Sequence, residues 1–161
     1  MDAWRLTKKK HLATAMTGKG AKDNGGRWNS IGIPMVYSAE NVALSVLDTL
    51  ANRDRLETLR PVLILAIQIP DDLILNLEAA LKQLNVRLNK RWYEEELDER
   101  RISSSQKIGN AWHDSGLSAV LRVPNTIVGM EHNLLINPDH PDAKKVKVKE
   151  MTPFRFDKRL A

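Results

Sequence analysis

The residues best suited to chemistry lie near the start of the chain, in a Gly-Gly-Arg-Trp-Asn-Ser run at 25–30 and a Pro-Met-Val-Tyr-Ser-Ala-Glu run at 34–40. Adjacent glycines allow a tight turn or a close approach of the backbone to a ligand. Arg27 has a planar donor fork that fits phosphate or carboxylate, Trp28 offers a flat surface, and Asn29 carries a donor and an acceptor. The pattern favours a nucleotide-phosphate site, although Gly-Gly-Arg also occurs in plain turns.

Four further polar residues have structural interpretations when each is taken singly. Arg5 fits a surface position of a strand, and Tyr37 fits a half-buried strand aromatic. Asn125 follows a proline, which is an ordinary turn pattern. Asp48 fits a solvated helix position, but it also falls beside the apolar boundary of its predicted helix, where a carboxylate can line a cleft.

Length and composition limit the class of protein. A chain of 161 residues suits one domain with a sizeable core. It contains no cysteine, which excludes disulfides, zinc–thiolate sites and thiol nucleophiles. Its four histidines are scattered without metal-binding spacing, so no metal site is predicted. The first residues do not form a signal peptide and no apolar run is long enough to cross a bilayer, so we expect a cytoplasmic protein without membrane contact.

The net charge of +5 has several interpretations. Basic residues gather at 8–10 and alternate at Lys145, Lys147 and Lys149, whereas residues 94–96 are all glutamate. No helix-turn-helix, zinc finger or aromatic–basic RNA motif accompanies them. We interpret the runs as solvated surface. A basic face would also suit an acidic partner protein or a dinucleotide, and direct nucleic-acid binding is the least favoured alternative.

The apolar pattern predicts an α+β domain. Residues 62–67 form a continuous apolar run between two prolines, which is typical of a buried strand. Residues 7–26 are polar and glycine-rich, and a connection of that length without secondary structure indicates function. We expect strands at 3–6, 35–37, 62–67, 118–123, 133–137 and 145–149, and helices at 39–52, 77–84 and 103–114.

The predicted helix at 39–52 has Ser38 as its expected N-cap. Its polar residues, Ser45, Asp48 and Thr49 among them, fall on the side away from the core. Its apolar face should carry Val42, Ala43, Val46, Leu47, Leu50 and Ala51.

These motifs, in this order, resemble the RES domain family. The first half of the match is Gly-Lys-Gly-Ala at 18–21, Gly-Gly-Arg-Trp-Asn at 25–29 and Val-Tyr-Ser-Ala at 36–39. The second half is Leu-Arg-Val-Pro at 121–124, Asn-Leu-Leu-Ile-Asn-Pro-Asp-His-Pro at 133–141 and Pro-Phe-Arg-Phe-Asp-Lys-Arg-Leu at 153–160. The resemblance covers the whole chain, so it implies one RES domain at 1–161. The implied fold is a single compact α+β domain with a mixed, ADP-ribosyltransferase-like β core and flanking helices.

The resemblance also implies site residues. Arg5 matches the family's early arginine, Arg27 the arginine of its Gly-Gly-Arg motif, and Tyr37 the tyrosine of the next strand. The family's acidic residue falls at Asp48, where glutamate is expected, and its serine falls at Asn125. By this resemblance the catalytic residues are Asp48, Arg27 and Tyr37, and the NAD-binding residues are Arg5, Arg27, Trp28, Asn29, Tyr37 and Asn125.

Family members are toxins of bacterial toxin–antitoxin pairs that consume NAD. The resemblance therefore implies a cytoplasmic toxin that cleaves the nicotinamide–ribose bond, as an NAD glycohydrolase or a mono-ADP-ribosyltransferase with a protein acceptor. NAD would be its substrate and no metal would be needed. The implied partner is an Xre-like antitoxin, through which alone the toxin would meet nucleic acid. Because Asp48 and Asn125 replace the family Glu and Ser, a weak enzyme is expected, and the alternative is a RES-fold binding module with weak or lost catalysis.

Overall fold

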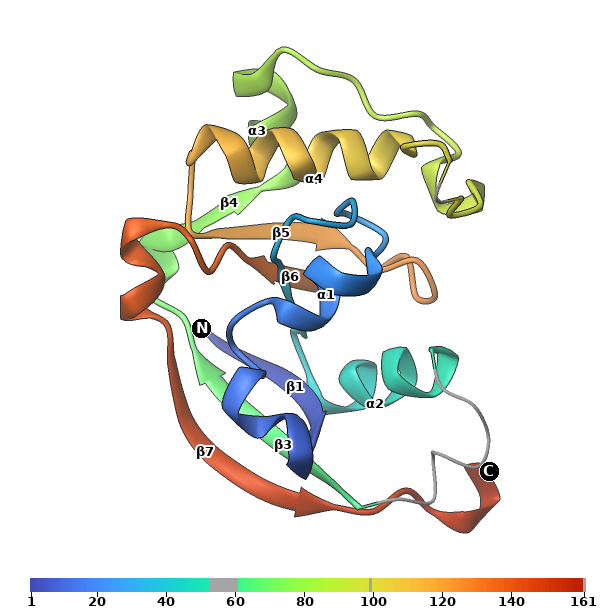
Figure 1. Cartoon of the computed structure of the whole chain (residues 1–161), viewed down its shortest axis with the longest axis vertical. Coiled ribbons are helices and arrows are strands. Elements are labelled where there is room, and N and C mark those ends of the chain that lie inside the picture. Colours follow the sequence, from blue (N-terminus) through green and yellow to red (C-terminus); the bar gives the residue numbers. More distant parts are fainter. Residues whose placement is uncertain (53–60, 99, 161) are drawn as a thin grey trace.

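The computed structural model describes residues 1–52, 61–98 and 100–160, which form a sheet with helices packed around it (Figure 1). The described strands are β1 (Asp2–Lys8), β2 (Val36–Ala39), β3 (Val62–Gln68), β4 (Ile74–Asn76), β5 (Val120–Pro124), β6 (His132–Ile136) and β7 (Lys147–Phe154). The α-helices are α1 (Lys19–Asn24), α2 (Val42–Ala51), α3 (Leu77–Leu84) and α4 (Ser104–Ser115). Short 3-10 helices are η1 (Lys9–Thr14), η3 (Asp71–Leu73), η4 (Trp92–Glu94), η5 (Pro141–Lys145) and η6 (Lys158–Leu160).

The described strands form a mixed sheet in the order β4-β5-β6-β2-β1-β3-β7. β4 and β5 pair in parallel, and the other described neighbours pair antiparallel. β1 pairs with β3 along its whole length, but it meets β2 through one residue pair, Trp4 and Ala39. The sheet therefore opens between β1 and β2. Figure 1 shows the result, with β4, β5 and β6 on one side and β1, β3 and β7 on the other.

Three buried clusters hold the helices on the sheet. α3 and α4 cover β5 and β6 through a cluster that includes Trp28, Trp92 and Trp112. α2 places Val42, Val46 and Leu50 against a second cluster on β1 and β3. The third cluster lies on the face near η1 and η5. A buried tryptophan is worth about 3–5 kcal/mol against alanine, so the first cluster fixes α4 firmly.

The predicted fold class and most predicted elements are confirmed. The apolar run at 62–67 is the buried strand β3, which lies between β1 and β7, and the predicted helix at 77–84 coincides with α3. Two expectations were wrong, and one strand was missed. Residues 7–26 are not a connection without secondary structure, because they contain the end of β1, η1 and α1. Short strand β4 has no predicted counterpart. The helix expected from 39 begins only at Val42.

The N-cap of α2 is Asn41, not Ser38. The Asn41 side chain accepts a hydrogen bond from the backbone N–H of Leu44 at 2.8 Å. Ser38 still belongs to β2, where it pairs with Leu134 and donates its hydroxyl to the Leu134 carbonyl at 2.8 Å. Strand pairing therefore moved the start of the helix beyond the residue that the sequence favours.

Candidate functional site

A cavity of about 570 Å³ lies at the opening between β1 and β2. Its walls come from β1, α1, the glycine–arginine loop at 25–28, β2, α2, and the ends of β5 and β6. Five residues predicted for the site line it: Arg5, Arg27, Trp28, Tyr37 and Asp48. Segments far apart in the sequence are thus brought together around one hollow.

The first turn of α4 holds the main chain of the arginine loop. Ser105 donates its hydroxyl to the carbonyl of Arg27 at 2.7 Å, and Gln106 Nε2 donates to the carbonyl of Gly26 at 3.0 Å. Ser105 and Gln106 are buried. Gly109 permits the close approach, because a Cβ there would overlap the carbonyl of Trp28. The helix predicted at 103–114 is confirmed, since Ser103 caps α4 in a capping box with Gln106.

Two guanidinium groups reach the cavity wall. Arg27 Nη1 donates to the backbone carbonyl of Glu95 at 2.6 Å. Arg5 Nη1 donates to the carbonyl of Tyr37 at 2.7 Å, while the buried Arg5 Nε finds no hydrogen-bond partner among the described residues. Burial lowers the pKa of Arg5, yet a guanidinium stays protonated in proteins. The two cations thus face a cavity in which an anionic ligand would complete their hydrogen bonds.

Tyr37 and Asn29 lock the loop to β2. The Tyr37 hydroxyl donates to Asn29 Oδ1 at 2.8 Å and accepts from the backbone N–H of Trp28 at 2.9 Å. Burial raises the pKa of Tyr37, and the Trp28 N–H and the charge of Arg27 oppose that rise less strongly. Tyr37 therefore stays neutral in the physiological range.

Asn29 and Trp28 act mainly as supports. Asn29 is fully buried, does not line the cavity, and donates its amide to the carbonyls of Ala21, Ser30 and Ile33. These bonds leave no amide donor free for a ligand, so the predicted direct NAD contact of Asn29 does not fit its position. Trp28 lines the cavity but is 2% exposed and packs on Trp92 with ring centroids 4.8 Å apart.

Asp48 lies on the side of α2 that faces the cavity. Asn125 Nδ2 donates to one carboxylate oxygen at 2.7 Å, and Asn133 Nδ2 donates to the other at 2.7 Å. Asn125 Nδ2 also donates to Asn133 Oδ1 at 2.8 Å. The carboxylate is therefore held in one orientation by two amides from the ends of β5 and β6.

Asn125 reaches Asp48 but does not line the cavity. It is 3% exposed, and its Oδ1 accepts from the backbone N–H groups of Ile127 and Val128. The turn interpretation is confirmed by these two bonds. The predicted direct contact of Asn125 with NAD stays a prediction, and its observed contact is with the carboxylate.

The predicted apolar face of α2 was wrong in part. Ala43, Leu47 and Ala51 are exposed, whereas Ser45 is buried and lines the cavity with Thr49. The helix buries a narrower stripe than its composition favours, because the side that carries Ala43, Leu47 and Ala51 faces solvent and does not pack on the sheet. Asn133 was missed altogether, although a polar residue at the start of an apolar strand was a usable signal.

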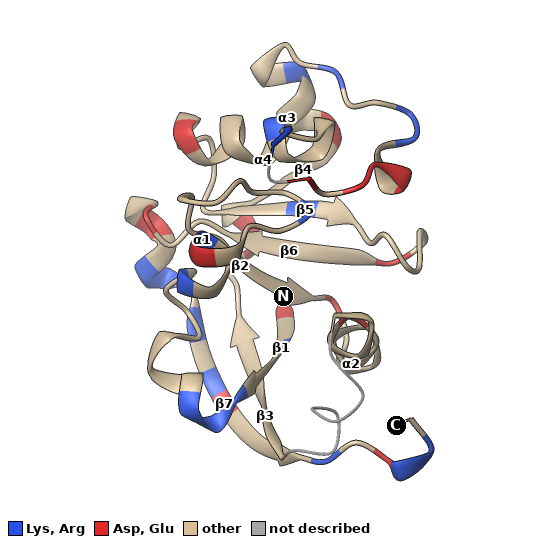
Figure 2. Cartoon of the chain, turned by 45° about the vertical axis from the view of Figure 1, so that its right-hand side comes forward, with Lys and Arg blue, Asp and Glu red and all other residues tan. Residues whose placement is uncertain are grey.

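Charged side chains of both signs are spread over the remaining surface. Figure 2 shows mostly Lys and Arg along β7, and both basic and acidic residues on the segment between α3 and α4. Lys145, Lys147 and Lys149 are exposed, as the surface interpretation predicts. A second hollow of about 560 Å³ lies across α1, lined by charged residues such as Lys22 and Asp23, and contains no predicted site residue.

Two features are absent from the described parts of the chain. Residues 1–52, 61–98 and 100–160 contain no group of three His, Asp or Glu side chains that could hold a metal. No helix in those ranges is long and apolar enough to cross a membrane.

Comparison with known proteins gives consistent matches over nearly the whole chain. A model of the RES domain matches residues 2–157. The Prs ADP-ribosylating toxin of Sphingobium sp. strain YBL2 is 35% identical over 159 residues, covering 98% of this chain and 94% of that protein. The Toxin Res of Photorhabdus laumondii is 32% identical over 163 residues, covering 99% and 97%. A chain from the crystal structure of the M. tuberculosis MbcT–MbcA toxin–antitoxin complex matches with a TM-score of 0.72 and 16% identity, covering 96% of this chain and 84% of that one, and shows likeness of fold.

Proposed function

This chain belongs to the RES domain family, and on that premise we propose that it is the toxin of a toxin–antitoxin pair and consumes NAD. Two relatives that match it over nearly their full lengths are named as toxins, and one of them as an ADP-ribosylating toxin. A structure with the same fold comes from a toxin–antitoxin complex. These names support a cytoplasmic enzyme with an antitoxin partner, which we propose to be Xre-like.

The proposed reaction breaks the bond between the nicotinamide nitrogen and ribose C1. The bonding electrons leave with nicotinamide, which departs neutral, and positive charge builds on the ribose. Water attacks C1 and loses a proton in hydrolysis, or a side chain of an acceptor protein attacks in ADP-ribose transfer. The relative named for ADP-ribosylating Prs supports a protein acceptor.

Each part of the cavity has a role in that reaction. Arg27 and Arg5 bind the pyrophosphate, since guanidinium groups pair with phosphate oxygens. Tyr37 keeps the arginine loop in place as a neutral hydroxyl. The Asp48 carboxylate stabilises the charge that develops on the ribose. The observation that carries the proposal is the held carboxylate of Asp48 on the wall of a cavity that two guanidiniums share.

The alternative function is a binding module with weak or lost catalysis. It is favoured by one observation, since both oxygens of Asp48 already accept hydrogen bonds from asparagine amides. A carboxylate oxygen has further acceptor capacity, so ribose hydroxyls can still bind. The two functions differ in whether nicotinamide is released.

The test is incubation of purified protein with NAD while free nicotinamide is measured by chromatography. The parent should release nicotinamide, and Asp48→Ala should lose that activity by at least about 100-fold. Asp72→Ala is the matched control, because Asp72 is exposed on η3 and does not line the cavity. A folded parent that binds NAD without releasing nicotinamide would favour the binding module.

A further inference from the structure

The segment at residues 89–98, between α3 and α4, contacts both the arginine loop and the first turn of α4. Its residue Glu95 makes these contacts through its backbone and through its side chain. The Glu95 backbone carbonyl accepts from Arg27 Nη1 at 2.6 Å. The Glu95 carboxylate accepts from the Ser104 hydroxyl at 2.6 Å, from the Ser104 backbone N–H at 2.8 Å and from Asn89 Nδ2 at 2.9 Å.

The carboxylate is well suited to its place. Ser104 is the first residue of α4, where backbone N–H groups lack helical partners and the helix dipole favours a negative charge. The hydrogen bonds from Ser104 lower the pKa of Glu95, so the side chain is ionised at neutral pH. Three hydrogen bonds thus fix this one residue of a charged segment.

The fixed position of Glu95 determines where the Arg27 side chain lies. Among the described residues, the Glu95 carbonyl is the one hydrogen-bond acceptor that the Arg27 guanidinium contacts. A guanidinium has five N–H donors, so this one contact within the described residues leaves most of its fork for a ligand. The main chain of Arg27 is held by Ser105 on the same turn of α4. Both ends of the arginine are therefore positioned from one helix end, the side chain through Glu95.

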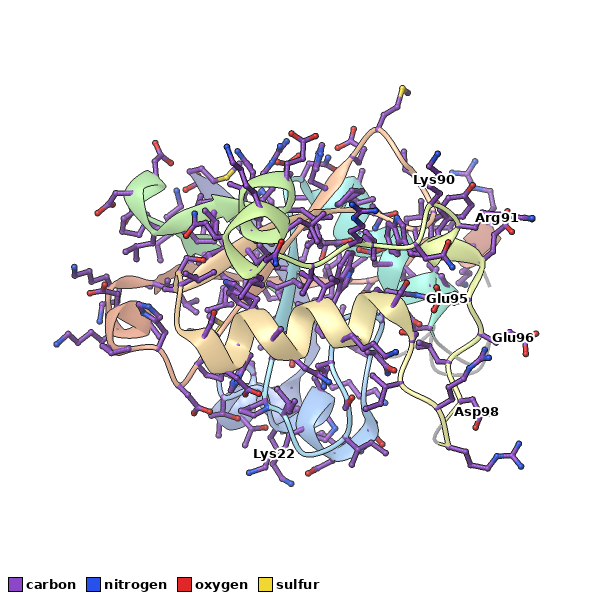
Figure 3. The ribbon with its side chains drawn as sticks, turned by 90° about the horizontal axis from the view of Figure 1, so that it is seen from above. Lys22, Lys90, Arg91, Glu95, Glu96 and Asp98 are labelled. Atoms are coloured by element: carbon purple, nitrogen blue, oxygen red, sulfur yellow. The ribbon has the colours of Figure 1, made fainter. Side chains whose placement is uncertain are left out.

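The neighbouring residue shows no such arrangement. Glu96 is exposed and makes no hydrogen bond or ion pair with the described residues. Figure 3 shows Glu95 beside the first turn of α4 and Glu96 pointing away from the molecule. Leu97, two residues beyond Glu95, lines the cavity. Movement of this segment would therefore change both the arginine and the cavity wall.

We propose that Glu95 is a positioning residue for Arg27, which sets the guanidinium for the diphosphate of the nucleotide. This inference rests on the proposed function, because it assigns Arg27 to the diphosphate. It adds a carboxylate outside the cavity, on a segment whose acidic run had been interpreted as surface alone.

The test compares Glu95→Gln with Glu96→Gln, each in the parent and in Arg27→Ala. Glutamine keeps the size of the side chain but loses the charge and replaces one acceptor oxygen with an amide donor. In nicotinamide release, Glu95→Gln should raise KM for NAD about 10-fold and change kcat by less than about 3-fold, as for one lost charge-assisted contact. Glu96→Gln should match the parent. In the Arg27→Ala background, Glu95→Gln should add no further loss.

Circular dichroism checks that each variant is folded. An unchanged KM in Glu95→Gln, or an equal additional loss in the Arg27→Ala background, overturns the inference. A parent that releases no nicotinamide counts against the proposed function instead. The same variants are then titrated calorimetrically with ADP-ribose, which keeps the diphosphate, and equal affinity of parent and Glu95→Gln overturns the positioning role.

Discussion

Asp48 and Asn125 form a coupled pair. Restoring the family's Glu and Ser should therefore maintain nicotinamide release only when both residues are changed. Asn125 Nδ2 lies 2.7 Å from one oxygen of the Asp48 carboxylate. In Asp48→Glu the carboxylate extends one methylene further and meets the Asn125 amide. In Asn125→Ser the amide is lost, and the shorter hydroxyl no longer reaches the aspartate. We expect each single change to lower nicotinamide release, and the double change to restore it to at least the parent rate.

The expected magnitudes follow from these contacts. A charge-assisted hydrogen bond contributes about 1.5–3 kcal/mol, so Asn125→Ser should cost about 10-fold in rate through a less ordered carboxylate. Displacement of a reacting group by roughly 1 Å can cost about 100-fold, and a flexible glutamate that partly repacks should lose about 10-fold. Additive effects would leave the double variant about 100-fold below the parent. Recovery to the parent rate gives a coupling of about 2.7 kcal/mol, within the range for contacting residues.

The assay is nicotinamide release by the four proteins at saturating and at low NAD. Asn24→Ser provides the matched control, because Asn24 is exposed and bonds the carbonyl of Gly20 in α1. Combined with Asp48→Glu, it should give additive effects. An additive result for Asn125→Ser as well would show that the two side chains do not act together and would refute the reasoning.

Two further predictions concern the packing that supports the cavity. Gly109→Ala should lower the stability by about 1–3 kcal/mol or more, seen as a lower Tm, because the new methyl group overlaps the Trp28 carbonyl, whereas Gly129→Ala, with no atom within 4 Å, should not. Because burial raises the pKa of Tyr37, its stabilising contribution is complete below about pH 10 and declines as pH rises further, when the unfolded chain ionises first. In urea unfolding between about pH 8 and 10.5, Tyr37→Phe should reduce this decline and Tyr93→Phe, at a half-exposed site, should keep it. Equal declines in stability in the parent, Tyr37→Phe and Tyr93→Phe would contradict the attribution of the decline to Tyr37.

Local sequence patterns predicted what depends on local physics. The apolar run in β3 has no polar side chain to bury, so it forms a largely buried strand with neighbours on both sides, β1 and β7. Arg27 was predicted for the site from its adjacent glycines, and Gly26 indeed leaves room for the Tyr37 hydroxyl. The start of α2 was not predictable in this way, since pairing of β2 with β6 kept Ser38 in a strand.

Which polar residues line the cavity, and which only support it from behind, depends on tertiary contacts. Asn29 and Asn125 carry the same amide as Asn133, yet Asn29 and Asn125 are buried behind the cavity and Asn133 lines it. Glu95 has the same chemistry as Glu96, and only the position of α4 gives it partners. A sequence shows which donors and acceptors exist. Which of them remain free for a ligand is decided by segments tens of residues away.

The net charge of the protein and the charge at the cavity come from different residues. The exposed lysines of β7 lie on the outer edge of the sheet, away from α2 (Figure 2). Exposed charges are screened over about 8 Å at physiological salt, so those lysines contribute little to the binding of a nucleotide in the cavity. Arg5 and Arg27 lie on the wall itself, and the buried Arg5 Nε has no partner among the described residues. The outer nitrogens of the two guanidiniums, rather than the enclosed Arg5 Nε, are the donors that a diphosphate in the cavity would meet. On the proposed function, we therefore expect affinity for an anionic substrate to depend on these two positioned guanidiniums rather than on the basic composition that the sequence displays.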